Sequence, residues 1–204
     1  MPSILRTVVL TDLGLRRGNN EDCAYAGRRV LAVADGMGGL PAGELASDLA
    51  VAALKELDEG TLVAPGEPGN DEPAVDEPAD GEPAADEDPL VGELRAAFDV
   101  ASGRIRVAAA QDGEQRYGMG TTVTAVLFGR ADDGSAGDES AGLDRAVLMH
   151  VGDSRGYLFR DGVLTQLTKD DTYVQALVDQ GVLTPDGARR HPQRSLVTQA
   201  MQGQ

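Results

Sequence analysis

The sequence predicts an α+β fold with antiparallel sheets, and two observations carry this prediction. Two long segments in the first half have apolar residues at helical spacing, and the second half consists mainly of short strand-like runs joined by turns. Adjacent helices followed by hairpin-connected strands favour antiparallel sheets over a parallel, doubly wound sheet. The 204 residues are enough for one domain with a buried core.

The first half is predicted to contain two strands and two helices. Arg6–Leu10 and Val30–Ala34 are short apolar runs rich in β-branched residues, which is typical of strands. Apolar residues then recur at three- and four-residue steps over Gly43–Leu57 and again over Leu90–Ala108. This period predicts two helices, each with one buried face.

The second half is predicted to be mainly strands, with one short helix. The predicted strands are Thr121–Phe128, Arg145–Val151, Gly156–Arg160, Val163–Leu167 and Ser195–Met201. Asp161-Gly162 favours a tight hairpin turn between the third and the fourth of these strands. The short helix is predicted at Tyr173–Asp179, and Gly181 is expected to end it in the left-handed conformation.

Composition excludes several classes of function. The formal net charge of −16 disfavours binding to nucleic acid or to an anionic membrane surface. No segment approaches the ~18–20 apolar residues of a membrane span, and the chain does not start like a secretory signal, so we expect no membrane segment and a cytoplasmic location. Cys23 is the only cysteine and His150 and His191 are the only histidines, which excludes an internal disulfide and a thiolate or His-rich zinc site.

Residues 65–89 differ in composition from the rest of the chain. They contain six prolines and ten acidic side chains, with no Lys or Arg. This composition predicts a disordered insertion between the two long helices, and a docking role for it stays open. We therefore expect one domain over residues 1–204. The Gly/Asp/Ser-rich segment Arg130–Leu143 is predicted to be a long hairpin loop.

The first motif with chemical meaning centres on Asp35. It follows the predicted strand Val30–Ala34 and precedes Gly36-Met37-Gly38-Gly39. A carboxylate at the end of a strand is held rigidly, and glycines let a backbone carbonyl face a cation. Such hard oxygen ligands suit Mg²⁺ or Mn²⁺. An isolated Asp-Gly is more often only a turn, so other motifs must decide between the two interpretations.

Two other motifs bear on that decision. Arg17 comes shortly before Glu21 and Asp22 in Arg-Gly-Asn-Asn-Glu-Asp. A guanidinium suits a phosphate monoester because it donates two parallel hydrogen bonds, and the two acids suit hydrogen bonds from metal-bound waters. A surface salt bridge among the three is the alternative. Asp153 follows the predicted strand Arg145–Val151, in the same strand-then-acid setting as Asp35.

Together the motifs resemble those of the PPM-type, or type 2C, protein phosphatases, in particular the bacterial branch. The matching segments, in the family's order, are Arg17…Asn19-Asn20-Glu21-Asp22, Val33-Ala34-Asp35-Gly36-Met37-Gly38-Gly39, Gly118-Met119-Gly120-Thr121-Thr122, Val151-Gly152-Asp153-Ser154-Arg155, Leu167-Thr168-Lys169-Asp170 and His191-Pro192. Each is weak alone, but their order and spacing argue against chance agreement. The resemblance covers nearly all of Arg6–Met201 except the acidic insertion at 65–89 and the segment Arg130–Leu143.

The resemblance implies two facing antiparallel sheets flanked by helices, an α-β-β-α sandwich, with two Mn²⁺ or Mg²⁺ ions at one end. Asp35 resembles the carboxylate that bridges both ions, and Gly36 resembles the residue whose carbonyl completes the first site. Asp153 resembles a ligand of the weaker third ion of bacterial members. The other implied site residues are Arg17, which would bind phosphate, and Glu21 and Asp22, which would hold coordinated waters.

The implied activity is hydrolysis of phosphoserine and phosphothreonine in proteins by a metal-activated water. The expected partners are phosphorylated signalling proteins, including Ser/Thr kinases and their substrates, and we expect a monomer. The alternative is a non-catalytic phosphopeptide-binding or regulatory relative that lacks a complete metal pair.

Three departures from the family pattern accompany the match. Met37 and Asp171 stand where many relatives have histidine. The family also completes its second metal with two later aspartates, which no acid of this chain convincingly replaces. We therefore expect a chain truncated before those aspartates and a sandwich incomplete at its carboxyl-terminal end.

Overall fold

The computed structural model describes residues 5–15, 18–37, 42–63, 88–111, 118–129 and 144–202. Its helices are α1 (Ala42–Glu59), α2 (Pro89–Gln111), α3 (Tyr173–Asp179) and α4 (Pro185–Arg190). Its strands are β1 (Asp22–Ala26), β2 (Val30–Met37), β3 (Gly120–Thr121), β4 (Val123–Gly129), β5 (Arg145–Val151), β6 (Tyr157–Arg160), β7 (Val163–Gln166) and β8 (Met201–Gln202). The α+β class predicted from the sequence is confirmed.

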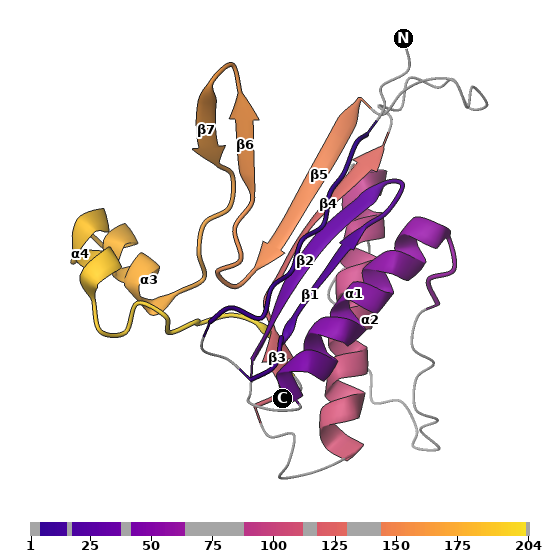
Figure 1. Cartoon of the computed structure of the whole chain (residues 1–204), viewed down its shortest axis with the longest axis horizontal. Coiled ribbons are helices and arrows are strands. Elements are labelled where there is room, and N and C mark those ends of the chain that lie inside the picture. Colours follow the sequence, from indigo (N-terminus) through magenta and orange to yellow (C-terminus); the bar gives the residue numbers. More distant parts are fainter. Residues whose placement is uncertain are drawn as a thin grey trace, which may run out of the picture.

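The strands form two antiparallel sheets. Six strands make the main sheet in the order β5-β4-β2-β3-β8, with β1 also paired to β2, and β6 pairs with β7 in a separate hairpin. Helices α1 and α2 lie along one face of the main sheet, and the hairpin with α3 and α4 lies on the other side (Figure 1). No helix within the described ranges is long and apolar enough to cross a membrane.

The core lies between the main sheet and the two long helices. Along β2, Val30, Ala32 and Ala34 are buried, as the period of two in a strand requires for a face covered by helices. Leu54 of α1 and Leu94 of α2 are fully buried against this face. Burial of each such leucine contributes about 1.5–3 kcal/mol to folding.

Both long helices confirm the helical periodicity, but α2 begins earlier than predicted. Pro89 is its first residue, and the Asp88 carboxylate caps it by accepting a hydrogen bond from the backbone N–H of Leu90 at 3.0 Å. The end of the predicted insertion at 65–89 is therefore the start of a helix. Residues 65–87 and the predicted loop at 130–143 lie outside the described residues.

Two strand predictions need correction, and one strand was not predicted. Arg6–Leu10 is not in a strand, because its backbone joins no ladder within the described chain. Of Ser195–Met201 only Met201 belongs to a strand, β8, and Val197 forms one isolated bridge. β1 was not predicted at all, since Asp22–Ala26 is short and rich in small residues.

The hairpin and the short helix α3 agree with the prediction. Asp161 and Gly162 have φ angles of 52° and 78°, as a type I′ turn between β6 and β7 requires. Gly181, with a φ of 73°, follows the end of α3. In contrast, α4 was not among the predicted elements, although Thr184 caps it and Pro185 opens it.

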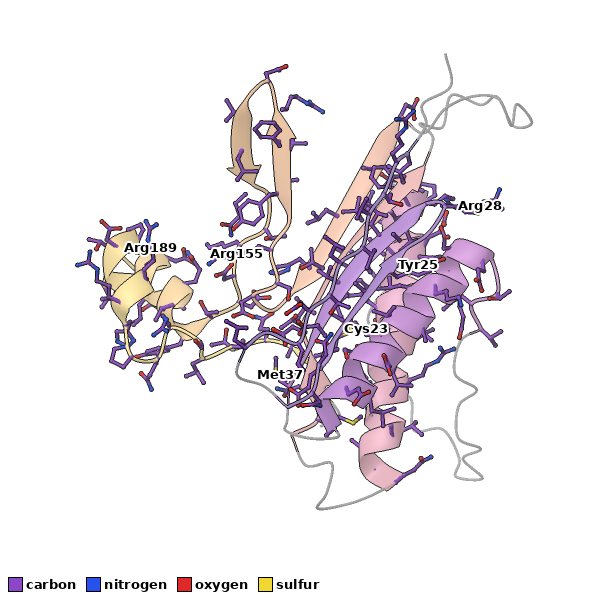
Figure 2. All side chains as sticks on the ribbon, viewed as in Figure 1. Cys23, Tyr25, Arg28, Met37, Arg155 and Arg189 are labelled. Carbon is purple, nitrogen blue, oxygen red and sulfur yellow. The ribbon has the colours of Figure 1, made fainter. Side chains whose placement is uncertain are left out.

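One carboxylate at the end of α1 holds the turn between β1 and β2. Asp58 accepts hydrogen bonds from the backbone N–H groups of Arg28 (2.8 Å), Arg29 (2.6 Å) and Val30 (3.0 Å) and from the Tyr25 hydroxyl (3.0 Å). Burial alone would raise the pKa of Asp58, but these four donors outweigh it and hold the pKa below its usual value. Figure 2 shows Tyr25 and Arg28 at this end of the sheet.

Replacing Asp58 with alanine should lower the free energy of unfolding by about 2–3 kcal/mol, because several donors lose a charged acceptor. Since the folded-state pKa is lowered, the stabilisation is present above the pKa of the unfolded carboxyl and is lost as the pH falls through the lower folded value. Urea denaturation at neutral and at acidic pH measures both effects.

The matched control for this test is Glu59→Gln. Glu59 forms an exposed pair with Lys55, at 3.9 Å, so its loss should change the unfolding free energy by less than about 0.5 kcal/mol. Equal destabilisation by the two variants would show that Asp58 is an ordinary surface acid.

Candidate metal centre

Asp35 belongs to a row of residues that crosses the main sheet near one end. Asp22 of β1 is directly opposite Asp35 of β2, and the β2–β4 and β4–β5 registers continue the row to Thr122 and Gly152. Residues opposite one another share a face of the sheet. Because Ala34 is buried on the helix side, the row lies on the face turned away from α1 and α2.

The strand around Asp35 extends further than predicted. Asp35 was expected just after the strand Val30–Ala34, but Gly36 and Met37 continue β2 by pairing with Thr121 and Gly120 of β3. Asp35 is therefore inside a strand with neighbours on both sides. This placement fixes its backbone more firmly than a turn would.

Glu21 lies immediately before β1, and its backbone is tied to two other elements. Its carbonyl accepts a hydrogen bond from the N–H of Gly36 at 3.1 Å and another from the Ser47 hydroxyl of α1 at 2.7 Å. Glu21 and Asp22 thus stand beside Asp35, as the motif predicted for water-holding acids, and these roles stay predictions. Arg17 lies outside the described residues.

Gly36 is required for close packing rather than for a turn. A methyl group on Gly36 would lie 2.1 Å from the carbonyl oxygen of Gly43 in α1 and 2.7 Å from that of Glu21. Gly36 continues β2 and makes no turn. Its predicted role as a carbonyl ligand stays a prediction.

Two threonines hold the backbone of Asp35 from the neighbouring strand. The Thr121 hydroxyl and the Thr122 N–H both donate to the Asp35 carbonyl at 3.0 Å. The Asp35 N–H in turn donates to the Thr122 hydroxyl oxygen at 3.2 Å. Both threonines are almost completely buried, so these bonds are shielded from water.

Asp153 lies in the turn that follows β5, as predicted. Gly152 has a φ of 104° there, a conformation that favours glycine. The Asp171 carboxylate accepts from the Gly152 N–H at 2.9 Å, and the Asp171 N–H donates to the Gly152 carbonyl at 2.7 Å. Asp171, noted in the sequence only as a departure from the family pattern, therefore fixes the turn that carries Asp153.

The Asp153 carboxylate is partly buried and lies near a second acid. Burial and then the neighbouring Asp170 carboxylate raise the pKa of Asp153, although Arg155 partly offsets them. The Arg155 guanidinium is itself occupied, because it donates two hydrogen bonds to Asp170, at 2.7 and 2.5 Å. A cation bound at Asp153 would stabilise the charged form of this carboxylate.

The Thr124 hydroxyl contacts both Ser154 and His150. The Thr124 hydroxyl donates to the Ser154 carbonyl, and His150 Nδ1 lies 2.8 Å from the same hydroxyl oxygen. Because the hydroxyl proton is already used, the Nδ1 of His150 must be the donor in that contact. His150 thus contacts the threonine that holds the turn after Asp153, a role that the sequence did not indicate.

The donor types present suit the predicted cations. Asp35 and Asp153 supply carboxylates, and Gly36 supplies a backbone carbonyl, which are the oxygen ligands that Mn²⁺ and Mg²⁺ prefer. Within the described ranges, however, no group of three or more His, Cys, Asp or Glu side chains gathers where it could hold an ion. These three residues therefore fit part of a metal site.

A cavity of about 950 Å³ adjoins Asp153. Asp153 and Arg155 line one side of it, and Gln175 of α3, Arg189 of α4 and Arg194 are among the residues that line the rest. Arg155 lies near the foot of the β6–β7 hairpin and Arg189 on α4 (Figure 2). The cavity thus joins an acidic turn to a segment rich in arginine.

Comparison with known proteins gives a consistent result, although no family model matches the chain. The chain is 47% identical to the serine/threonine protein phosphatase PstP of Mycobacterium tuberculosis over 201 residues, which are 98% of this chain and 32% of PstP. It is 32% identical to the protein phosphatase PhpP of Streptococcus pneumoniae over 95% of this chain and 66% of PhpP. The chain thus spans about a third of PstP and nearly two thirds of PhpP.

The fold agrees with the sequence comparison. The PPM Ser-Thr phosphatase MsPP of Mycobacterium smegmatis superposes with a TM-score of 0.65 at 30% identity, over 97% of this chain and 67% of that one. The chain belongs to the PPM family of Ser/Thr phosphatases. The PstP catalytic domain, solved in complex with two manganese ions, gives a TM-score of 0.66 at 43% identity, over 93% of this chain and 64% of that one. The predicted resemblance to bacterial PPM phosphatases is confirmed.

Cys23 differs from the nucleophile of a cysteine-dependent enzyme. It lies in β1 and packs against the core. Burial first, and then the hydrogen bond and charge of Asp48, raise its pKa to about 11. A thiol with this pKa is protonated at neutral pH and therefore a poor nucleophile.

Alkylation of Cys23 by iodoacetamide should accordingly be slow near neutral pH and should rise with a midpoint near pH 11. Asp48→Asn should lower that midpoint, because it removes a negative charge beside the thiol. Glu44→Gln, on the exposed side of the same helix, is the control and should leave the midpoint in place. A midpoint close to that of free cysteine in the unaltered chain would contradict the burial argument.

Proposed function

We propose that the protein hydrolyses phosphoserine and phosphothreonine in other proteins, with Mn²⁺ or Mg²⁺ as cofactor. The observation that carries this proposal is the family membership over nearly the whole chain, together with the PstP catalytic domain in complex with two manganese ions. The oxygen donors at Asp35, Gly36 and Asp153 support it. We also propose a single domain over residues 1–204, with the insertion at 65–89 outside the site.

The proposed roles are those implied by the resemblance of the motifs to the family. Asp35 and Gly36 would be the first ligands, and Asp153 would serve a further ion. Bound Mn²⁺ or Mg²⁺ would supply a nucleophile at neutral pH by lowering the pKa of water and would neutralise charge on the phosphoryl oxygens. Glu21 and Asp22, beside Asp35 in the sheet, would orient water molecules, and Arg17 would bind the phosphoryl group.

The proposed partners follow from the activity. We infer phosphorylated Ser/Thr proteins as substrates, with Ser/Thr kinases and their targets among them. We further propose a cytoplasmic monomer. Negative net charge supports protein partners over nucleic acid.

A second candidate function is phosphopeptide binding without hydrolysis. It is favoured by one observation, that the described residues gather no group of three or more potential metal-binding side chains. A cation held by one carboxylate and one carbonyl would bind weakly, because few protein oxygens replace its waters. The two functions differ in whether inorganic phosphate is released.

The first test uses the full gene product and a phosphothreonine peptide. Phosphate release should require Mn²⁺ or Mg²⁺ and stop when EDTA is added. Asp35→Asn should lower kcat at least about 100-fold, because it removes the charge of a proposed metal ligand. The thermal unfolding midpoint should stay nearly the same, since Asp35 lies on the face away from the core.

The control is Glu59→Gln, which changes an exposed acid on α1 that pairs with Lys55. It should leave phosphate release intact. Turnover that survives chelation, or full activity of Asp35→Asn, would overturn the proposed hydrolase. Peptide binding with no release of phosphate would favour the second candidate.

We place the polypeptide part of the substrate in the cavity beside Asp153. Residues 184–195 contain three arginines and one aspartate, although the whole chain carries a net charge of −16. Arg189 and Arg194 of this segment line the cavity. A phosphopeptide with acidic residues near its phosphoserine would therefore meet complementary charge there.

Arg194→Glu should raise KM for an acidic phosphopeptide about 10-fold, because an attractive contact becomes repulsive. The small substrate p-nitrophenyl phosphate, which has no peptide, should respond much less. Arg190→Glu makes the same charge change on a neighbour that does not line the cavity, so it is the control. Equal effects of both variants would show that only net charge matters.

A further inference from the structure

We propose that Thr122 is a positioning residue that sets the spacing between Asp35 and Asp153 through Ser154. This inference rests on the proposed function, because it concerns two predicted metal ligands. Thr122 lies between them: its backbone N–H donates to the Asp35 carbonyl at 3.0 Å, and its side chain packs against Gly152 on the other side. It is only 1% exposed, so its hydroxyl must find its partners within the protein.

The Thr122 hydroxyl makes hydrogen bonds on two sides. The Asp35 N–H donates to the Thr122 hydroxyl oxygen at 3.2 Å, which leaves the hydroxyl proton available. The Ser154 hydroxyl oxygen lies 2.6 Å from the Thr122 hydroxyl oxygen. One buried hydroxyl thus joins the backbone of Asp35 to the residue that follows Asp153.

The methyl group of Thr122 adds a steric constraint. A methyl group built on Gly152 would lie 2.5 Å from the Thr122 Cγ2 atom, so the turn before Asp153 packs tightly on this threonine. Thr124, two residues further on, donates to the Ser154 carbonyl. Ser154 is therefore fixed at its side chain and at its backbone by two threonines of the same strand region.

This arrangement has a consequence for metal binding. Metal ligands must be held within about 0.5 Å of the required geometry, and loss of the groups that orient them typically costs about 10- to 100-fold in affinity. Without the Thr122 hydroxyl, the turn carrying Asp153 would lose its side-chain link to β2. The separation of the two carboxylates would then be held less firmly, although Asp171 and Thr124 still hold the turn.

The experiment measures Mn²⁺ affinity of the full gene product by calorimetry, with no substrate present. Thr122→Val keeps the shape but removes the hydroxyl, and it should weaken Mn²⁺ binding about 10-fold or more. Ser154→Ala should have a similar effect, and the double variant should be no weaker than either single one, because both remove one link. Thr122→Ser restores the hydroxyl and should recover most of the affinity.

Tyr25→Phe is the control, because it also removes one hydroxyl hydrogen bond but at the opposite end of β1. It should leave Mn²⁺ affinity unchanged. Unchanged affinity in Ser154→Ala, or strictly additive losses in the double variant, would overturn the inference even if Thr122→Val fails to fold. If the unaltered protein binds no Mn²⁺, both this inference and the proposed function fail. If it binds Mn²⁺ and Ser154→Ala binds equally well, only this inference fails.

Discussion

The contact between Gly36 of β2 and Gly43 of α1 sets how closely the first helix lies on the main sheet. No larger residue fits at Gly36 unless the helix moves, because the Gly43 carbonyl occupies the space of a side chain. The same closeness lets the Ser47 hydroxyl reach the Glu21 carbonyl at 2.7 Å, where the Gly36 N–H also donates. Three elements thus meet at one carbonyl oxygen, and Asp35 stands next to it in the strand.

The alternation along β2 separates stability from chemistry. Val30, Ala32 and Ala34 face the helices and are buried in the core, whereas Val33 and Asp35 lie on the opposite face. That opposite face changes from apolar near Val33 to polar at Asp35. Because core packing and the candidate site use opposite faces of one strand, the acidic residues add no unpaired charge to the core.

Local patterns predicted the fold elements that depend on local interactions. Both long helices, α3 and the β6–β7 hairpin were predicted because helical periodicity and the Asp161-Gly162 turn involve residues close in sequence. The strand predictions for Arg6–Leu10 and Ser195–Met201 were wrong. A strand needs a pairing partner, and a short apolar run does not indicate whether a distant segment will pair with it. Helix α4 was not predicted, although Thr184 and Pro185 are typical residues for the start of a helix.

The candidate site depends on the pairing register of the strands. This dependence explains which site residues could be predicted from the sequence and which could not. The motifs supplied Glu21, Asp22, Asp35 and Asp153 by residue type and order, and the structure puts the first three at one end of β1 and β2. Thr122 and Asp171 gave no such signal, because a hydroxyl or a carboxylate acquires its partner only when the strands align. A one-residue shift of β4 would turn Thr122 toward the helices and break its bonds to Asp35 and Ser154 together. The site geometry is therefore fixed by the same strand pairing that builds the core.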